Sequence, residues 1–152
     1  MSSNVAHPSL SAWARQRITE LFQATNPDQF ETAFNKFMSD NVASIVVNGK
    51  NLSRDQWKHQ LQDMRVMEQS ATVKFLGSVE TVNISEELSG EVGIFCEVNI
   101  DKRASVIGIP KAALVTMIMP DRSLHIPPGA STNLDFRRVF DMTCVYTEKE
   151  LV

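Results

Sequence analysis

The chain has few of the residues from which metal sites and disulfide frameworks are built. Its 152 residues include two cysteines and three histidines. The spacing of Cys96 and Cys144 resembles neither a metal cage nor a disulfide framework, and both residues fall in apolar, strand-like segments. We therefore expect buried thiols in a reducing compartment, no metal site and no cofactor.

Positive charge is scarce as well. Fifteen Lys and Arg residues stand against eighteen Asp and Glu residues, which gives a net charge of −3. No basic stripe offers the cluster of cations that binding to a phosphate backbone requires. Nucleic acid is therefore not an expected partner.

Long apolar runs are also missing. The longest, residues 112–119, has eight residues, whereas a membrane-spanning helix needs about 20. Residues 1–8 show neither the charged start nor the apolar run of a secretion signal. We expect a cytoplasmic protein that does not bind membranes. Since domains usually have roughly 100–200 residues, the length fits one domain over residues 1–152.

Helical periodicity dominates the first part of the chain. Apolar residues recur every three or four positions between polar ones, which predicts an amphipathic helix over residues 9–24, with Ser9 as its cap. Asn26 followed by Pro27 is typical of a second helix start, since Asn caps well and proline suits the first helical position. An apolar stripe follows, from Phe30 onward.

A strand and a third helix are predicted next. Residues 42–47 form a β-branched run, and Asn48-Gly49 directly after it indicates a turn, because both residues tolerate positive φ. Ser53 and Gln56 have the spacing of a capping box, in which each side chain bonds to the backbone N–H of the other. This pattern predicts a helix that begins after Ser53.

The rest of the chain has the character of long strands. Residues 72–84, 92–100, 112–119 and 134–146 are rich in β-branched and aromatic residues and are bounded by turn-forming residues. Short connections between four such strands indicate an antiparallel meander. Gly77, midway along the first of them, is a candidate β-bulge that bends the sheet.

The third of these strands, residues 112–119, is apolar on both faces. One face is expected to cover the protein interior. The other face meets either a second subunit or the chain's own terminus, because an exposed apolar sheet face promotes aggregation. A homodimer formed through the sheet is the interpretation that we favour.

This order of elements resembles the nuclear transport factor 2-like superfamily, which includes ketosteroid isomerases, scytalone dehydratases and SnoaL-like polyketide cyclases. The resemblance is most specific over residues 39–43, 47–57 and 135–142, and the last segment is similar to uncharacterised fungal members. It implies an α+β fold: a cone-shaped half-barrel in which three N-terminal helices pack on a curved antiparallel sheet. A mostly apolar pocket would lie inside the cone.

The sequence supplies many aromatic side chains for such a pocket. For the two arginines among the candidates, an alternative is favoured, in which the stem covers apolar surface and the charge lies in water. The expected ligand-binding residues are Trp13, Arg17, Phe34, Trp57, Cys96, Arg138 and Phe140.

Enzymes of this superfamily transfer protons, and the sequence offers few groups for that chemistry. The predicted strand over residues 42–47 has no acid or imidazole where isomerases of this fold carry an acid. Asp141 and Tyr146 are the candidate catalytic residues. Alternation along the last strand favours an outward-facing Asp141; facing inward, burial would raise the pKa of its carboxyl toward that of a usable base. Tyr146 either donates a hydrogen bond into the pocket or caps the edge of the sheet.

Three functions follow from these patterns. The first is a protein that binds a small hydrophobic molecule, which explains an apolar lining without an acid and base. The second is a cofactor-independent isomerase, cyclase or dehydratase. The third is a dimeric interaction module whose interior is filled by side chains.

Overall fold

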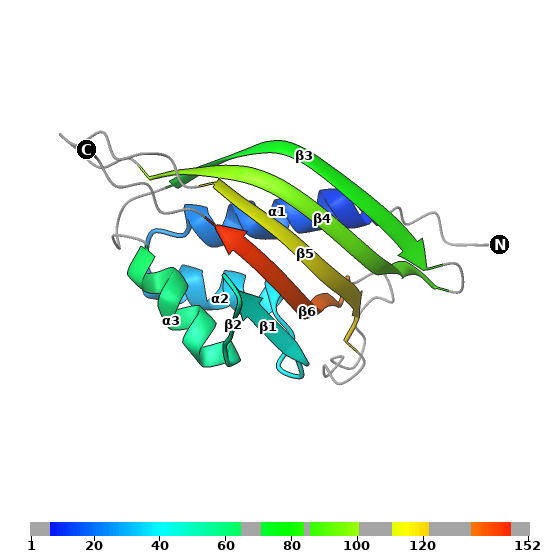
Figure 1. The fold of residues 1–152 in the computed structure, drawn as a ribbon, viewed down its shortest axis with the longest axis horizontal. Helices are drawn as coiled ribbons and strands as arrows, with labels where there is room; N and C mark the ends of the chain where they lie inside the picture. The colour runs from blue at the N-terminus through cyan, green and yellow to red at the C-terminus, as the bar shows by residue number, and fades with distance from the viewer. Residues whose placement is uncertain (1–6, 65–70, 84–85, 101–110, 122–134, 147–152) are drawn as a thin grey trace, which may run out of the picture.

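The computed structural model describes residues 7–64, 71–83, 86–100, 111–121 and 135–146. Within these ranges the chain forms three helices and a six-stranded sheet with strand order β2-β1-β6-β5-β4-β3. The elements are α1 (Leu10–Gln23), α2 (Pro27–Phe37), β1 (Ser44–Val47), β2 (Lys50–Asn51), α3 (Arg54–Met64), β3 (Ala71–Asn83), β4 (Glu86–Ile100), β5 (Lys111–Pro120) and β6 (Arg137–Tyr146). The long strands curve over the helices (Figure 1). This is the predicted α+β architecture.

Each helix begins at its predicted cap. The side chain of Ser9 accepts a hydrogen bond from the backbone N–H three residues on, and that of Asn26 does the same. Ser53 and Gln56 form the reciprocal capping box: the Ser53 Oγ accepts the Gln56 N–H at 3.1 Å, and the Gln56 Oε1 accepts the Ser53 N–H at 2.8 Å. Local side-chain chemistry thus fixes where the helices start.

The sheet confirms the meander and adds a parallel edge. β3, β4, β5 and β6 pair antiparallel in sequence order. β1, however, pairs in parallel with β6 and joins β2 through the predicted turn, in which Asn48 and Gly49 have φ values of 50° and 82°. β4 begins at Glu86, earlier than predicted, because Gly90 is paired on both sides within the sheet and does not end the strand. Residues 84 and 134, predicted strand ends, lie outside the described ranges.

The strand register shifts at three places, one of them between Val82 and Asn83 of β3, and the other two concern predictions made from the sequence. The register of β3 against β4 shifts between Phe75 and Gly77 and leaves Leu76 without a partner in the register, so the bulge lies directly before Gly77, where one was predicted. The second irregularity lies in β6, where the register against β5 shifts between Val139 and Asp141 and leaves Phe140 without a partner in the register.

The bulge at Phe140 changes the alternation of β6. Arg137 and Val139 are buried before it, and Met142 is buried after it. A single alternation phase for the whole strand, as predicted from the sequence, would have put Arg137 and Val139 outside. That prediction is wrong, because one extra residue moves the following side chains to the opposite face.

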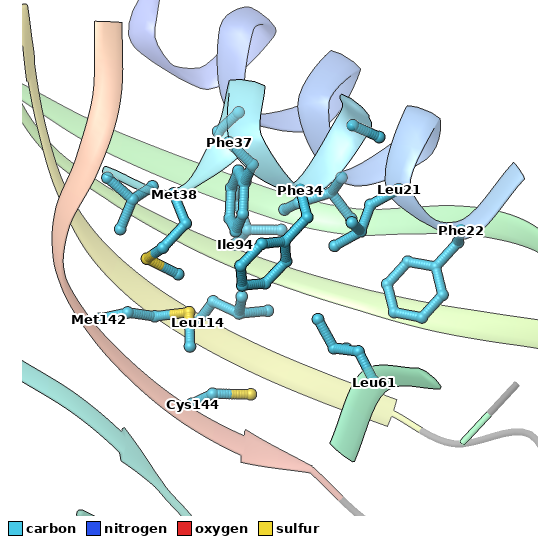
Figure 2. Packing of buried hydrophobic residues seen from close by; sticks show 14 of the residues in the cluster. Leu21, Phe22, Phe34, Phe37, Met38, Leu61, Ile94, Leu114, Met142 and Cys144 are labelled. Carbon is cyan, nitrogen blue, oxygen red and sulfur yellow. The ribbon is translucent and has the colours of Figure 1, made fainter. Parts of the chain in front are cut away.

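The hydrophobic core lies between the helices and the inner face of the sheet. α1 packs on β3 and β4, while α2 packs on α1 and β6. Figure 2 shows the side chains of Phe34 and Phe37 from α2 pointing toward Ile94 and Leu114 on the sheet, with Leu61 of α3 approaching the same space. Burying each such side chain contributes roughly 1.5–3 kcal/mol. The core therefore holds both helices against the sheet.

Candidate functional site

A small cavity lies where the three helices meet the inner face of β4, β5 and β6. Its volume is about 40 Å³, and its wall includes Leu21 of α1, Phe37 of α2, Trp57 of α3 and Leu114 of β5. Ligand pockets usually have roughly 300–1,000 Å³, and a cavity of about 150 Å³ binds benzene. In this conformation the cavity is too small for a ligand of that size.

Two of the predicted ligand-binding residues, Trp57 and Cys96, line this cavity, as does Tyr146, one of the two candidate catalytic residues. Trp13 and Phe34 belong instead to the core, with exposed fractions of 1% and 0%. The Trp13 ring packs against the ring of Phe37, and Phe37 itself lines the cavity. Trp13 and Phe34 therefore belong to the core and do not line the cavity.

The two candidate arginines lie away from the cavity wall. The Arg17 guanidinium pairs with Glu20 at 2.7 Å and lies 5.9 Å from the ring centroid of Trp13. Arg138 donates from Nε to the backbone oxygen of Asn35 at 2.8 Å, near the end of α2. Burial lowers the pKa of Arg138, and the nearby charge of Arg17 lowers it further. Neither arginine lines the cavity, and both contact other protein groups.

Asp141 and Phe140 do not reach the cavity either. Asp141 is exposed on the outer face of the sheet, directly opposite Met117 of β5. The outward alternative for Asp141 is therefore the right one, and the inward placement is wrong. Phe140 is half-buried at the bulge and lies outside the cavity wall. Among the described residues, no carboxylate or imidazole lines the cavity.

Tyr146 lines the cavity and anchors α3 to the end of β6. Its hydroxyl accepts a hydrogen bond from the side-chain amide of Gln60 at 2.5 Å. Its backbone N–H donates to Oδ1 of Asn48 in the β1–β2 turn at 2.9 Å. The tyrosine thus borders the cavity and ties the end of the interior strand β6 to α3 and to the β1–β2 turn.

The two cysteines are packed, neutral thiols. Burial raises the pKa of Cys96 to about 11. Burial also raises the pKa of Cys144, with a contribution from Cys96, to about 12. Since the thiolate is the reactive form, neither residue supplies a nucleophile near neutral pH.

Trp57 carries one of two buried side-chain polar atoms that have no hydrogen-bond partner among the described residues, the other being Ser89 Oγ. Trp57 is 3% exposed, and within the described part of the chain its indole Nε1 has no hydrogen-bond partner. A buried donor without an acceptor costs about 1–3 kcal/mol. Trp57 lines the cavity, while its indole nitrogen is buried and the cavity surface is apolar.

A buried ion pair beside the core was also missed. Arg137 is 1% exposed and donates to both carboxylate oxygens of Asp135, from Nε at 2.9 Å and from Nη2 at 2.6 Å. The guanidinium lies 5.8 Å from the ring centroid of Trp13. Burial raises the pKa of the Asp135 carboxyl, but hydrogen bonds and charge from Arg137 outweigh it, so the net pKa is lowered. The pair fixes the start of β6 against α1.

Solved structures share this arrangement over nearly the whole chain. The NTF2-like domain of Mex67 from Chaetomium thermophilum, complexed with Mtr2, matches with a TM-score of 0.60 and 9% identity, over 93% of this chain and 100% of that chain. An NTF-2 like protein of unknown function from Pseudomonas aeruginosa matches with a TM-score of 0.54 and 11% identity, over 88% and 92% of the two chains. The chain has an NTF2-like fold. The predicted resemblance is thereby confirmed at the level of the fold, which many functions share.

Two further comparisons with known proteins find no match. A scan against protein-family models finds no match, and a search of the curated proteins finds none. Among the described residues, no helix is long and apolar enough to span a membrane, and no group of three or more His, Cys, Asp or Glu residues could hold a metal ion.

The sheet of this NTF2-like chain has an apolar outer face as well as an apolar inner one. We define the outer apolar face as Val79 of β3, Phe95 of β4, Val115 and Met117 of β5, and Val145 of β6. All five side chains are between 40% and 69% exposed. The predicted two-sided apolar character of the third meander strand is confirmed, because Leu114, Thr116 and Ile118 of β5 are buried on the other side.

Proposed function

We propose that the protein binds a small apolar molecule between the helices and the sheet. The observation that carries this proposal is the composition of the cavity wall, which combines aliphatic and aromatic side chains from all three helices with neutral thiols from the sheet. Such a wall favours desolvation of an apolar ligand. It offers no acid and base pair among the described residues, so it supports binding better than proton transfer.

Binding requires the cavity to expand, and α3 is the wall that can move. Helices α1 and α2 pack broadly on each other and on the sheet, whereas within the described ranges α3 makes fewer close approaches to other elements. It is held by the buried side chains of Trp57 and Leu61 and by polar contacts at its surface. These contacts are the ion pair of Lys58 with Glu31, the hydrogen bond of Gln60 to Tyr146, and the hydrogen bonds of Arg54 to the end of α2. A ligand that binds only the expanded form shifts the population toward it.

Thermal unfolding with a graded series of apolar compounds tests this proposal. A ligand that binds the folded state raises the midpoint with concentration. Ala112 lines the cavity, so Ala112→Leu should fill the space and abolish the shift. Ala43 is exposed before β1, and Ala43→Leu is the matched control that should keep it. The proposal fails when no compound class shifts the wild-type midpoint, or when the two variants respond alike.

We also propose that the outer apolar face binds a second copy of the chain. Charged residues flank this face at opposite ends of the strands. Lys74 and Lys111 lie at one end, where Glu97 stands between them and pairs with Lys111 at 3.9 Å, so that end keeps one excess positive charge. Glu91 and Asp141 lie at the other end. A two-fold axis across the strands would place the acidic end of each copy against the basic end of its partner. This charge arrangement favours a second copy over an unrelated partner.

The assembly of a solved neighbour is consistent with such a role. The Mex67 NTF2-like domain is complexed with Mtr2 in its structure, so this fold is compatible with protein–protein association. Sedimentation equilibrium tests the homodimer. Val115 is 55% exposed, and Val115→Lys should produce a monomer, while Thr32→Lys on the exposed side of α2 should stay dimeric. A monomeric wild type at high micromolar concentration would exclude this proposal.

A further inference from the structure

We infer that α3 is a hinged lid over the cavity: it pivots on its contacts with α2, and the hydrogen bond between Gln60 and Tyr146 is the latch that keeps it closed. This inference rests on the proposed ligand binding and adds how access to the cavity is controlled. The small apolar molecule would enter between α3 and the end of β6.

The hinge is the side of α3 that contacts α2, the helix beside it in Figure 1. Arg54, at the start of α3, donates from Nε to the backbone oxygen of Ser39 at 3.2 Å and from Nη2 to Oδ1 of Asn35 at 2.8 Å. One turn later, Lys58 forms an ion pair with Glu31. These contacts join α3 to α2 or to the segment directly after it, so α3 can rotate about them without breaking them.

The latch joins α3 to the sheet. Among the described residues, a single hydrogen bond connects a side chain of α3 to a strand: the Gln60 amide donates to the Tyr146 hydroxyl at 2.5 Å. Tyr146 is itself held in place, because its backbone N–H donates to Oδ1 of Asn48 at 2.9 Å. Breaking the latch therefore releases α3 from its polar contact with the sheet and leaves the end of β6 where it is.

The cavity lies between the hinge and the latch. With 3.6 residues per turn, Arg54 falls on one side of the buried pair Trp57 and Leu61, and Gln60 falls on the other. Trp57 and Tyr146 both line the cavity, so opening the latch separates two parts of its wall. The closed cavity has about 40 Å³, so we expect a ligand the size of benzene to bind only the open form. Its affinity is then reduced by the fraction of molecules that are open.

Native-state hydrogen exchange measures this motion without a ligand. It gives an opening equilibrium constant for each backbone amide, and amides that open locally exchange faster than those that open only on global unfolding. We expect the amides in the second half of α3 to open more often than those of β4 and β5. Equal opening constants in α3 and in these strands would show that α3 leaves the sheet only when the chain unfolds, and would overturn the inference.

Three variants separate the latch from the hinge. Tyr146→Phe keeps the ring in the cavity wall and removes the hydroxyl, so the opening constant of α3 should rise roughly fivefold, the effect of one lost hydrogen bond. Gln60→Ala should give a similar rise, and combining the two changes should add little, because both remove the same bond.

The third variant, Arg54→Met, removes hydrogen bonds that the open form retains. It should lower the midpoint of global unfolding without raising the opening constant of α3. An unchanged opening constant in Tyr146→Phe, or an equal rise in Arg54→Met, would overturn the inference.

Benzene binding to the same variants connects the lid to the proposed function. Thermal midpoints at graded benzene concentrations give the dissociation constant, which should fall roughly fivefold in Tyr146→Phe and stay unchanged in Arg54→Met. Equal dissociation constants in the wild type and in Tyr146→Phe would overturn the role of the latch in ligand access. When α3 opens as expected but neither benzene nor the wider apolar series binds, the proposed ligand binding fails, while the hinge and the latch of α3 stand.

Discussion

Gly90 is the position in the sheet where even a methyl group has no room. A Cβ atom there would lie 2.1 Å from the backbone oxygen of Thr81 in β3 and 2.6 Å from Cδ1 of Leu10 in α1. The Leu10 side chain can rotate away, but the Thr81 oxygen belongs to a paired strand. Because Gly90 pairs with Val82 on one side and with Ile118 on the other, Gly90→Ala must displace β3 from the sheet.

The size of the effect follows from that distance. Real Cβ contacts essentially never fall below 3.0 Å, so the Thr81 oxygen must retreat by about 1 Å. Overpacking of this kind costs about 1–3 kcal/mol. For a chain of this length each kcal/mol lowers the thermal midpoint by roughly 2–4 °C. We therefore expect Gly90→Ala to lower the midpoint by roughly 2–12 °C.

Calorimetry of Gly90→Ala beside Gly77→Ala measures this effect against a matched control. Gly77 lies on the neighbouring strand, and a Cβ there would meet nothing within 4 Å. Alanine at such a site also reduces the conformational freedom of the unfolded chain, so Gly77→Ala should be neutral or slightly stabilising. Equal midpoints for the two variants, or a wild-type midpoint for Gly90→Ala, would refute the reasoning.

Three further predictions concern charge and reactivity. Arg137 lowers the pKa of Asp135 below its ordinary value of 3.8, so the stability that this pair contributes is present above that value and is lost as the pH falls through the folded-state pKa. The urea midpoint should therefore decline less steeply with falling pH in Asp135→Asn than in the wild type. Parallel declines of the two midpoints would contradict this. Because the pKa values of Cys96 and Cys144 are raised to about 11 and about 12, iodoacetamide at pH 8 should modify both thiols only after unfolding, as read by intact mass, and rapid labelling of the native protein would count against their burial. Asp141→Asn should leave any ligand-induced rise in the thermal midpoint unchanged, since Asp141 lies on the outer face; loss of that rise would reopen a role in the site.

Much of the fold could be predicted because its signals are local. The side chains of Ser9, Asn26 and Ser53 cap the helices through bonds to backbone groups within three residues. The turn at Asn48 and Gly49 needs two residues that tolerate positive φ. In each case the sequence neighbours are also the physical partners, so no knowledge of the tertiary structure was needed.

The candidate site was harder to predict because its geometry depends on distant segments. Trp57, Cys96 and Tyr146 were correctly expected at the cavity, since each lies on the apolar side of its own element. Arg17 and Arg138 lie off the cavity wall for different reasons. Arg17 pairs with Glu20 three residues on in α1, whereas the contact of Arg138 with the Asn35 oxygen depends on how β6 packs against α2.

The sequence by itself thus determined the elements, their caps and the inner and outer faces of the regular strands. Periodicity records burial directly, and each of these features depends on residues a few positions apart. This explains why the NTF2-like architecture was recognisable before any contact was known.

Only the tertiary structure decided how distant segments meet. It set the parallel pairing of β1 with β6, the bulge at Phe140 that turns Asp141 outward, and the packing that leaves the indole N–H of Trp57 without an acceptor. Each depends on register and volume across the sheet, where a shift of one residue exchanges inside for outside. A local sequence pattern does not record such shifts.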